Sequence, residues 1–322
     1  MGKARHRVAP EVANHVNRNL ESLSIRLVSR VVRKLPPPWI ENKRGRRPHN
    51  PKTVAICCIL RILLCKTYDE MESWCKTNAE LHRVLRTTDL PTHSVLHRGM
   101  EKLTLAYIRK VMRFLILEHR KRGMTVALDS SGFSMSRSSK WFDIRIKRVS
   151  TKKDFLKLHI SIDVETGLIL SFTITASNVH DTKEFKRLLR YLPRIAKCLA
   201  DAGYISRKNC SYVAIEKHGK PYIMFKVNST GKAKGSRAWK ESFHEYKENS
   251  ESWLAVYHLR SIIESVFGSM KRRWSDCVFS RRAWMRKREL ALRVLAYDIK
   301  QVLYLRRAKE LGIPLRIPVT TT

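Results

Sequence analysis

Two aspartates each follow a short apolar run, where a buried strand would give way to a turn. Asp129 comes after Met124–Leu128, and Asp201 comes after Ile195–Ala200. In open α/β sheets, ligands and catalytic groups gather beyond the carboxyl ends of the strands, so these two side chains are candidates for one site. An aspartate in such a position is also a common turn former or helix cap, and either aspartate alone would indicate no more than that.

A third carboxylate, Glu264, lies in the segment 254–271, which the sequence predicts to be one long helix. One stripe of that helix would carry a phenol, a guanidinium, a carboxylate and an ammonium group, from Tyr257, Arg260, Glu264 and Lys271. A stripe that faced a core would be apolar. The stripe therefore belongs either to a site shared with the two aspartates or to a solvated face on which Arg260 pairs with Glu264. Such a set of carboxylates would suit a hard cation such as Mg²⁺.

The elements that would position these residues change character near Gly123. Residues 1–122 carry apolar positions at helical spacing and basic loops, which predicts an all-α N-terminal region. Its short helices are typical either of a helix-turn-helix unit or of plain bundle packing. Residues 123–310 read as strand, hairpin, helix, strand, helix, strand, loop and helix, and the polar segment near 231–252 is predicted to be an insertion or a mobile loop. That order predicts an RNase H-like α/β domain with a mixed sheet and helices on both faces.

The charge of the chain is strongly unbalanced. Its 322 residues include 65 Lys+Arg against 28 Asp+Glu, which gives a formal net charge of +37. So large a positive field calls for a polyanionic partner, and nucleic acid is the first choice. An anionic membrane and a ribosome-like structural role are the alternatives. Residues 137–157 and 271–293 interleave basic residues with tryptophan, which is typical of a groove that follows a DNA backbone.

The seven cysteines are scattered and odd in number, and none forms a Cys-x-x-Cys pair. This usage predicts reduced thiols in the cytoplasm and gives no zinc-binding spacing. The longest apolar run, 54–65, is interrupted by Arg61 and is too short to cross a bilayer. It is predicted to be a core helix, and no membrane partner is expected.

Several motifs resemble those of one protein family. The spacing Tyr-x2-Arg-x3-Glu-x6-Lys around Glu264 resembles the signature of a group of bacterial and archaeal insertion-sequence transposases of the DDE type. Residues 127–132 and 200–204 are similar to the first and second aspartate motifs of that group. Residues 177–181 resemble a motif that follows the third strand in one branch of that group. Residues 46–51 resemble the N-terminal region of the same branch. The resemblance covers residues 45–305.

The resemblance implies a transposase that binds the terminal inverted repeats of an insertion sequence, cleaves the DNA strands and transfers them to a target. It also implies that the N-terminal region, residues 1–122, binds DNA or dimerises. Asp129, Asp201 and Glu264 would be the catalytic residues and would hold two Mg²⁺ ions, for which Mn²⁺ would substitute. The residues that would contact DNA are Tyr257, Arg260, Lys271, Arg272, Arg273, Arg46 and Arg47. His180 and Asp181 are accessory candidates, with a helix-capping aspartate beside a buried histidine as the alternative.

The implied partners are double-stranded DNA, from the transposon ends and the target, and a second copy of the chain in a homodimer. The implied location is the prokaryotic cytoplasm, at the nucleoid when DNA is bound. Two other functions stay open. A catalytically inactive, transposase-derived DNA-binding protein would be expected to have lost at least one of the carboxylates, and all are present. An RNase H-fold nuclease would cleave DNA without strand transfer.

Overall fold

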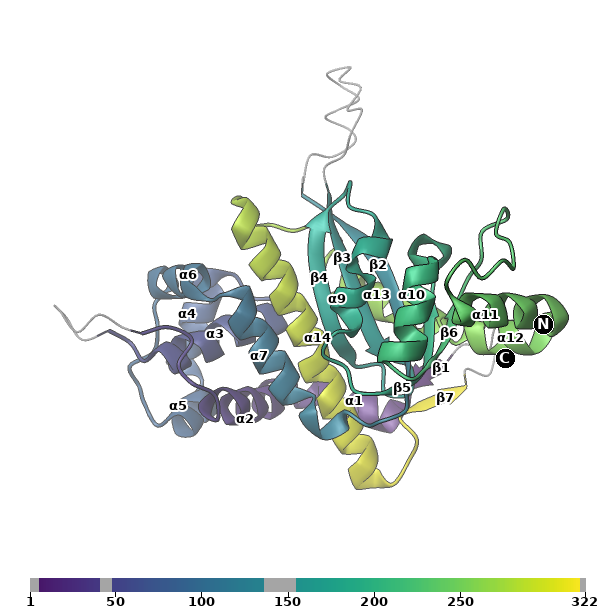
Figure 1. Ribbon diagram of the computed structural model, residues 1–322. Coiled ribbons are helices and arrows are strands. Elements are labelled where there is room, and N and C mark those ends of the chain that lie inside the picture. The colour runs from purple at the N-terminus through teal and green to yellow at the C-terminus, as the bar shows by residue number, and fades with distance from the viewer. Residues whose placement is uncertain (1–5, 41–47, 136–154, 319–322) are drawn as a thin grey trace, which may run out of the picture. The chain divides into compact units, whose positions relative to one another are not determined.

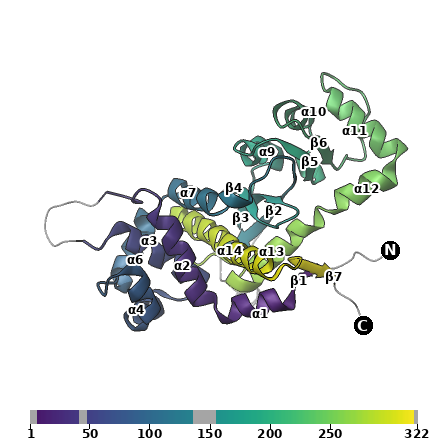
Figure 2. The same cartoon turned by 90° about the horizontal axis from the view of Figure 1, so that it is seen from below.

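The computed structural model describes residues 6–40, 48–135 and 155–318 (Figures 1 and 2). Contacts divide the chain into two compact units. One comprises Met1–Glu118 together with Arg288–Thr322, and the other comprises His119–Lys287. Within the described ranges, no helix combines the length and the apolar character that a membrane span requires.

The first unit is mainly helical. Its elements are α1 (Pro10–Arg18), α2 (Leu20–Arg33), α3 (Pro51–Leu63), α4 (Tyr68–Thr77), α5 (Ala79–Leu85), α6 (His93–Lys102), α7 (Leu105–Leu115) and most of α14 (Ala283–Leu311). The short strands β1 (His6–Val8) and β7 (Arg316–Pro318) pair antiparallel, so the N-terminal region is not purely α-helical as predicted. A strand was missed there because three residues carry too little pattern to identify one.

Helix α3 is the buried helix that the apolar run predicted. Asn50 caps its first turn by accepting a hydrogen bond from the amide of Lys52, and Pro51 begins the helix where its missing N–H costs nothing. The end of α14 packs in the same unit, where Ala308 joins Ala9 and Val12 in one apolar cluster. The predicted catalytic domain extended to residue 310, whereas residues 288–322 group with the N-terminal helices.

The contact between α3 and α6 depends on a residue without a side chain. A Cβ placed on Gly99 of α6 would overlap Cγ1 of Val54 and would lie 3.3 Å from Sγ of Cys58, both on α3. We expect Gly99→Ala to lower the free energy of unfolding by about 1–3 kcal/mol, because overpacking a close helix contact forces the helices apart. Urea unfolding followed by circular dichroism measures this change.

A matched control lies in α13 (Ser261–Trp274), where a Cβ on Gly268 would meet no atom within 4 Å. There alanine should add up to about 1 kcal/mol through its better helix propensity. Equal effects of the two substitutions would contradict the packing argument.

The second unit contains a five-stranded mixed sheet in the order β4-β3-β2-β5-β6. Its strands are β2 (Met124–Ser134), β3 (Phe155–Asp163), β4 (Ile169–Ala176), β5 (Ile195–Ala200) and β6 (Lys220–Ile223). β2, β3 and β4 pair antiparallel, whereas β5 runs parallel to both β2 and β6. The hairpin between β3 and β4 turns at Gly167, whose φ of 71° favours glycine.

Helices cover this sheet on both faces, as predicted. They are α9 (Asp181–Leu189), α10 (Arg207–Ser211), α11 (Arg237–Glu248), α12 (Ser250–His258) and α13, with the short helices η2 (Ala202–Tyr204) and η3 (Tyr212–Glu216). α9 packs on β3 and β4, and α13 packs on β2 from the opposite face (Figures 1 and 2). Because α9 covers the polar side of β3, His159, Ser161 and Asp163 are buried there.

The segment 231–252 was predicted to be a polar insertion or a mobile loop, and the prediction of a mobile loop was wrong. It contains α11 and the start of α12. Trp239 and Ser242 of α11 are buried, and the rings of Phe243 and Tyr246 pack on Phe225 at centroid distances of 5.2 and 5.7 Å. The many charged residues of α11 lie on its exposed side, and they hid the aromatic face in the sequence.

Candidate active site at the ends of strands β2 and β5

Strand pairing places Asp129 and Asp201 next to each other in the sheet. Leu128 and Ala200 are the last paired residues of the parallel strands β2 and β5, and each aspartate is the following residue. Asp201 ends its strand, as predicted. Asp129 does not end β2, because the strand continues to Ser134 while paired with β3. The prediction of a turn after Asp129 was therefore wrong, although the register that brings the aspartates together is the expected one.

Arg260 connects Asp129 to Glu264. Its Nη1 atom lies 2.6 Å from Oδ2 of Asp129, and its Nη2 atom lies 3.1 Å from Oε1 of Glu264. The expected single helix over 254–271 is in fact α12 and α13, with Arg260 in the cap position before α13. The predicted stripe on one continuous helix was thus wrong. The break between the helices places a guanidinium where it reaches carboxylates of both β2 and α13.

Burial dominates the electrostatics of Asp129. It raises the pKa of this carboxyl above its ordinary value, and the negative charge of Asp201 adds to the rise. The amide of Ser130, which donates to Oδ1 at 2.8 Å, and the guanidinium of Arg260 act in the opposite direction. A positive charge nearby stabilises the ionised form of a partly buried carboxyl that has an acidic neighbour, and Arg260 supplies part of that charge.

The other predicted DNA contacts lie in different surroundings. Tyr257 is buried, its ring stacks on Trp253 at 5.5 Å, and the Arg260 guanidinium carbon lies 5.7 Å from its centroid. The Lys271 ammonium lies 5.3 Å from the centroid of Phe133 in β2. Arg272 and Arg273 are exposed on α13. Arg46 and Arg47 lie outside the described residues, as does most of the basic segment 137–157.

A second polar cluster lies beside Asp129, centred on Asp181 at the start of α9. Oδ1 of Asp181 is 2.5 Å from Nζ of Lys157 and accepts a hydrogen bond from the Ser130 hydroxyl at 3.4 Å. Asp181 also approaches Gly203, where a Cβ would come within 3.0 Å of Oδ2. Asp181 therefore connects β2 and β3 to the turn that follows Asp201.

The buried histidine of this cluster is His159 and not His180. His180 is exposed in the cap position of α9 and makes no capping hydrogen bond through its side chain. His159 is fully buried, 3.3 Å from the Tyr204 hydroxyl and 3.0 Å from that of Thr175. Burial lowers the pKa of His159, and Asp181 partly counters this. Lys157 and His159 were not selected from the sequence, although two polar residues two apart in an apolar strand were a usable signal.

We expect Asp181→Asn to lower both stability and activity. The substitution removes the partner of Lys157, whose side chain is only 21% exposed, and should lower the free energy of unfolding by about 1–3 kcal/mol. It also changes the polar contacts of a side chain that touches Ser130 and lies close to Gly203, which closely follow the two aspartates of the site in sequence, so the DNA-cleavage rate should fall at saturating DNA. The measurements are urea unfolding and single-turnover cleavage.

Glu165→Gln is the control, because Glu165 pairs with Lys121 at the surface, where ion pairs contribute little to stability. Equal stability of the two variants would contradict this role.

The donor set at the strand ends fits a hard divalent cation. Asp129, Asp201 and Glu264 offer carboxylate oxygens, which such ions prefer. The guanidinium of Arg260 forms ion pairs with two of these carboxylates, those of Asp129 and Glu264, so a positive charge already occupies the space between them. In the part of the chain that the structure describes, no three His, Cys, Asp or Glu side chains converge as a ready metal site. Metal binding would therefore require Arg260 to release its partners.

The strand order, the mixed pairing and the helices on both faces fit an RNase H-like α/β domain, and two aspartates follow the last paired residues of its adjacent parallel strands. The family described as "Transposase DDE domain" matches residues 120–299, which is more than half of the chain, and the chain belongs to this family. It is thus a DDE-type transposase in the broad sense. Enzymes of this family generally use divalent metal ions.

A search of solved structures finds similarity to the "Cryo-EM structure of piggyBac transposase synaptic complex with hairpin DNA". The similarity covers 92% of this chain and 74% of that chain, at 10% sequence identity and a TM-score of 0.43. At this level the likeness bears on neither the site nor the mechanism. A comparison with curated proteins finds no match.

Proposed function

We propose that the chain cleaves DNA strands at the terminal inverted repeats of an insertion sequence and transfers them to a target, in a reaction that needs a divalent metal. One observation carries the proposal: Asp129 and Asp201 follow paired strand residues, and Arg260 links Asp129 to Glu264. The enzyme would act on double-stranded DNA as a homodimer, in the prokaryotic cytoplasm and at the nucleoid.

Asp129, Asp201 and Glu264 would hold two Mg²⁺ ions, for which Mn²⁺ would substitute. When bound, such ions activate the attacking oxygen and stabilise the leaving oxygen of an in-line phosphoryl displacement. Within the chain itself, Asp129 must lose its proton, and its raised pKa makes that harder at low pH. Arg260 counters this, because its guanidinium favours the ionised carboxylate.

Arg260 would have a second role once it releases the carboxylates. A guanidinium binds phosphate through two parallel N–H groups, and the face of Tyr257 supports Arg260 within reach of Asp129. Arg272 and Arg273, exposed on α13, would contact the DNA backbone. Lys271 contacts the Phe133 ring and would add charge to the same helix. Arg46, Arg47 and the N-terminal helices would bind the terminal repeat.

Strand transfer separates this function from a nuclease of the same fold. The substrate is a labelled, pre-cleaved repeat end with a free 3′-hydroxyl, incubated with a supercoiled target plasmid and Mg²⁺. We expect a product in which the label is joined to the plasmid, and no such product from Glu264→Gln. Cleavage of an intact end without joining would favour the nuclease, and DNA binding without either reaction would favour the inactive DNA-binding protein.

A further inference from the structure

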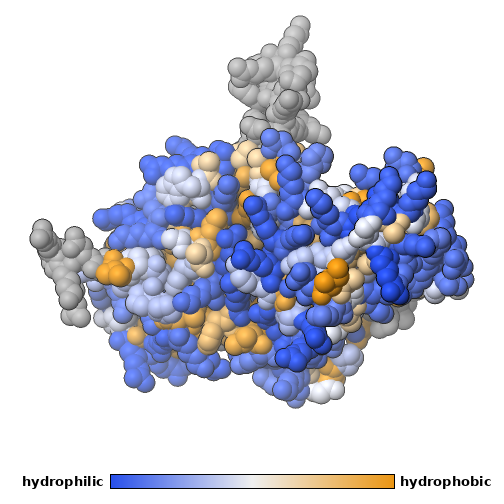
Figure 3. All heavy atoms as spheres, in the orientation of Figure 1, coloured by the Kyte–Doolittle hydropathy of each residue, from blue (hydrophilic) through white to orange (hydrophobic). Residues whose placement is uncertain are grey.

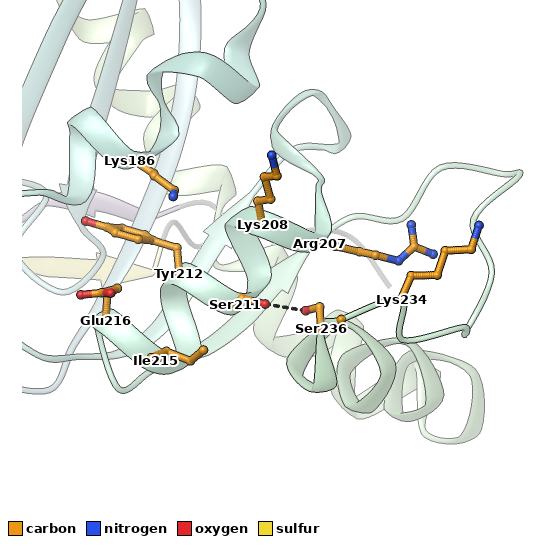
Figure 4. A pocket seen from close by; sticks show the side chains of 10 residues that line it. Lys186, Arg207, Lys208, Ser211, Tyr212, Ile215, Glu216, Lys234 and Ser236 are labelled. Carbon is orange, nitrogen blue, oxygen red and sulfur yellow. Dashed lines mark hydrogen bonds between the residues drawn. The ribbon is translucent and has the colours of Figure 1, made fainter.

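A basic pocket lies on the second unit, formed by α9, α10, η3 and the segment before α11. Its volume is about 300 Å³. The lining residues are Lys186, Arg207, Lys208, Ser211, Tyr212, Ile215, Glu216, Lys234, Gly235 and Ser236 (Figure 4). Four of them are cationic and only Glu216 is acidic. The surface over α9, α10 and α11 is mainly hydrophilic (Figure 3).

Among the residues that the structure describes, no ion pair joins the cationic side chains of the pocket to a carboxylate. Arg207 donates to the carbonyl oxygen of Lys232 and lies over the Trp239 ring at 4.5 Å. The Lys186 ammonium lies 5.2 Å from the centroid of Tyr212. Four cationic groups against one carboxylate leave the pocket with a net positive charge, which a bound anion would neutralise.

Hydroxyl groups complete the donor set. Ser211 donates a hydrogen bond to Oγ of Ser236 at 2.8 Å, and the same Oγ atom accepts from the amide of Trp239 at 3.2 Å. These contacts hold α10 against the start of α11 and fix the floor of the pocket. Ammonium, guanidinium and hydroxyl donors around one depression match the oxygen atoms of a phosphate group.

The exposure of the lining favours a polymer over a small ligand. Sites for small molecules enclose most of the ligand and are largely apolar. Here Lys186, Lys208 and Lys234 are exposed, and in the view of Figure 4 they and Arg207 follow one another across the opening. A row of exposed cations suits a phosphodiester backbone that passes over the pocket.

We propose that this basic pocket binds the phosphodiester backbone of duplex DNA, as a contact additional to those of the active-site residues. The proposal rests on the proposed function, because it assigns part of the same DNA substrate to the pocket. Chain connectivity supports it: α10 begins six residues after Asp201, so one short segment carries an aspartate of the acidic site and the pocket residues Arg207 and Lys208. The pocket would contribute affinity and not chemistry, since none of the carboxylates assigned to the metal ions lines it.

The test is the salt dependence of binding to a labelled duplex, measured for Lys208→Gln/Lys234→Gln. The plot of the logarithm of the association constant against the logarithm of the salt concentration has a negative slope. Losing two phosphate contacts should make this slope less steep by about 1.8 and weaken binding roughly tenfold or more near 0.1 M salt. The control is Lys240→Gln/Lys247→Gln, which removes the same charge from exposed positions of α11 outside the pocket. It should change the slope by less than about 0.5. Arg207 is left in place because it supports the fold.

The outcomes separate the pocket from the proposed function. Equal slopes for the two double variants would overturn the pocket proposal. Saturable binding of inorganic phosphate that is lost in Lys208→Gln/Lys234→Gln, with an unchanged DNA slope, would overturn it in favour of a free phosphate ligand. Cleavage at saturating DNA should equal that of the wild type in both variants. A wild-type protein that binds the duplex but never cleaves it would contradict the proposed function and leave the slope comparison valid.

Discussion

Replacing Asp129 with asparagine is expected to abolish strand cleavage while leaving DNA affinity within about twofold, because a metal-bound carboxylate contributes several kcal/mol to the transition state. By the same reasoning the cleavage rate should fall by about a thousandfold or more, since each factor of ten in rate corresponds to about 1.4 kcal/mol. Asp201→Asn and Glu264→Gln should behave alike. Single-turnover cleavage of a labelled repeat end and a binding titration in Ca²⁺ measure the two quantities separately.

The control for these variants is Glu251→Gln, which removes a carboxylate from the exposed side of α12. It should retain the wild-type rate. Loss of DNA binding in all of the site variants, together with lower unfolding free energies, would mean that the carboxylates have a structural role. A cleavage rate within about tenfold of the wild type for Asp129→Asn would contradict the catalytic assignment.

Replacing Arg260 is expected to weaken DNA binding and cleavage together. Arg260→Gln removes the only cationic partner that the structure gives Asp129 within the described residues, so the pKa of Asp129 should rise further. It also removes the proposed phosphate clamp. We expect cleavage to fall by about a hundredfold or more and affinity by about tenfold, since charge-assisted hydrogen bonds are worth about 1.5–3 kcal/mol each.

Arg260→Lys separates charge from geometry. Lysine keeps the positive charge but presents a point charge in place of the planar fork, so it cannot reach Asp129 and Glu264 in the same way. This variant should retain more DNA affinity than Arg260→Gln and still cleave slowly. In Arg260→Gln the pKa of Asp129 should be higher, so Asp129 stays protonated up to a higher pH. The fall of the cleavage rate at acid pH should therefore begin at a higher pH than in the wild type. Unchanged affinity and cleavage in both variants would contradict the clamp.

Parts of the fold could be read from the sequence because their patterns are local. β5 occupies the residues that its apolar run predicted, and the alternation in 156–163 identified β3. Asp129 and Asp201 were found from the same kind of pattern, because each comes directly after a short apolar run. The adjacency of the aspartates followed from the parallel order of the strands and not from either motif alone.

Other features depend on tertiary contacts that the sequence does not show. The break between α12 and α13 falls at Leu259 and Arg260, where neither proline nor glycine marks it. The alternation in β3 does not show that α9 covers its polar residues and makes His159 a buried member of the Asp181 cluster. The aromatic packing of α11 was hidden by the charged residues around it.

The central claim is that Asp129 in β2, Asp201 after β5 and Glu264 in α13 perform metal-dependent cleavage at a repeat end. The most direct measurement is cleavage of a labelled duplex that carries the DNA flanking this gene, with Mg²⁺ or with EDTA, for the wild type and Asp201→Asn. We predict nicking at the repeat boundary that requires Mg²⁺ and is lost in Asp201→Asn. Binding of the duplex without any cleavage in either Mg²⁺ or Mn²⁺ would contradict the claim.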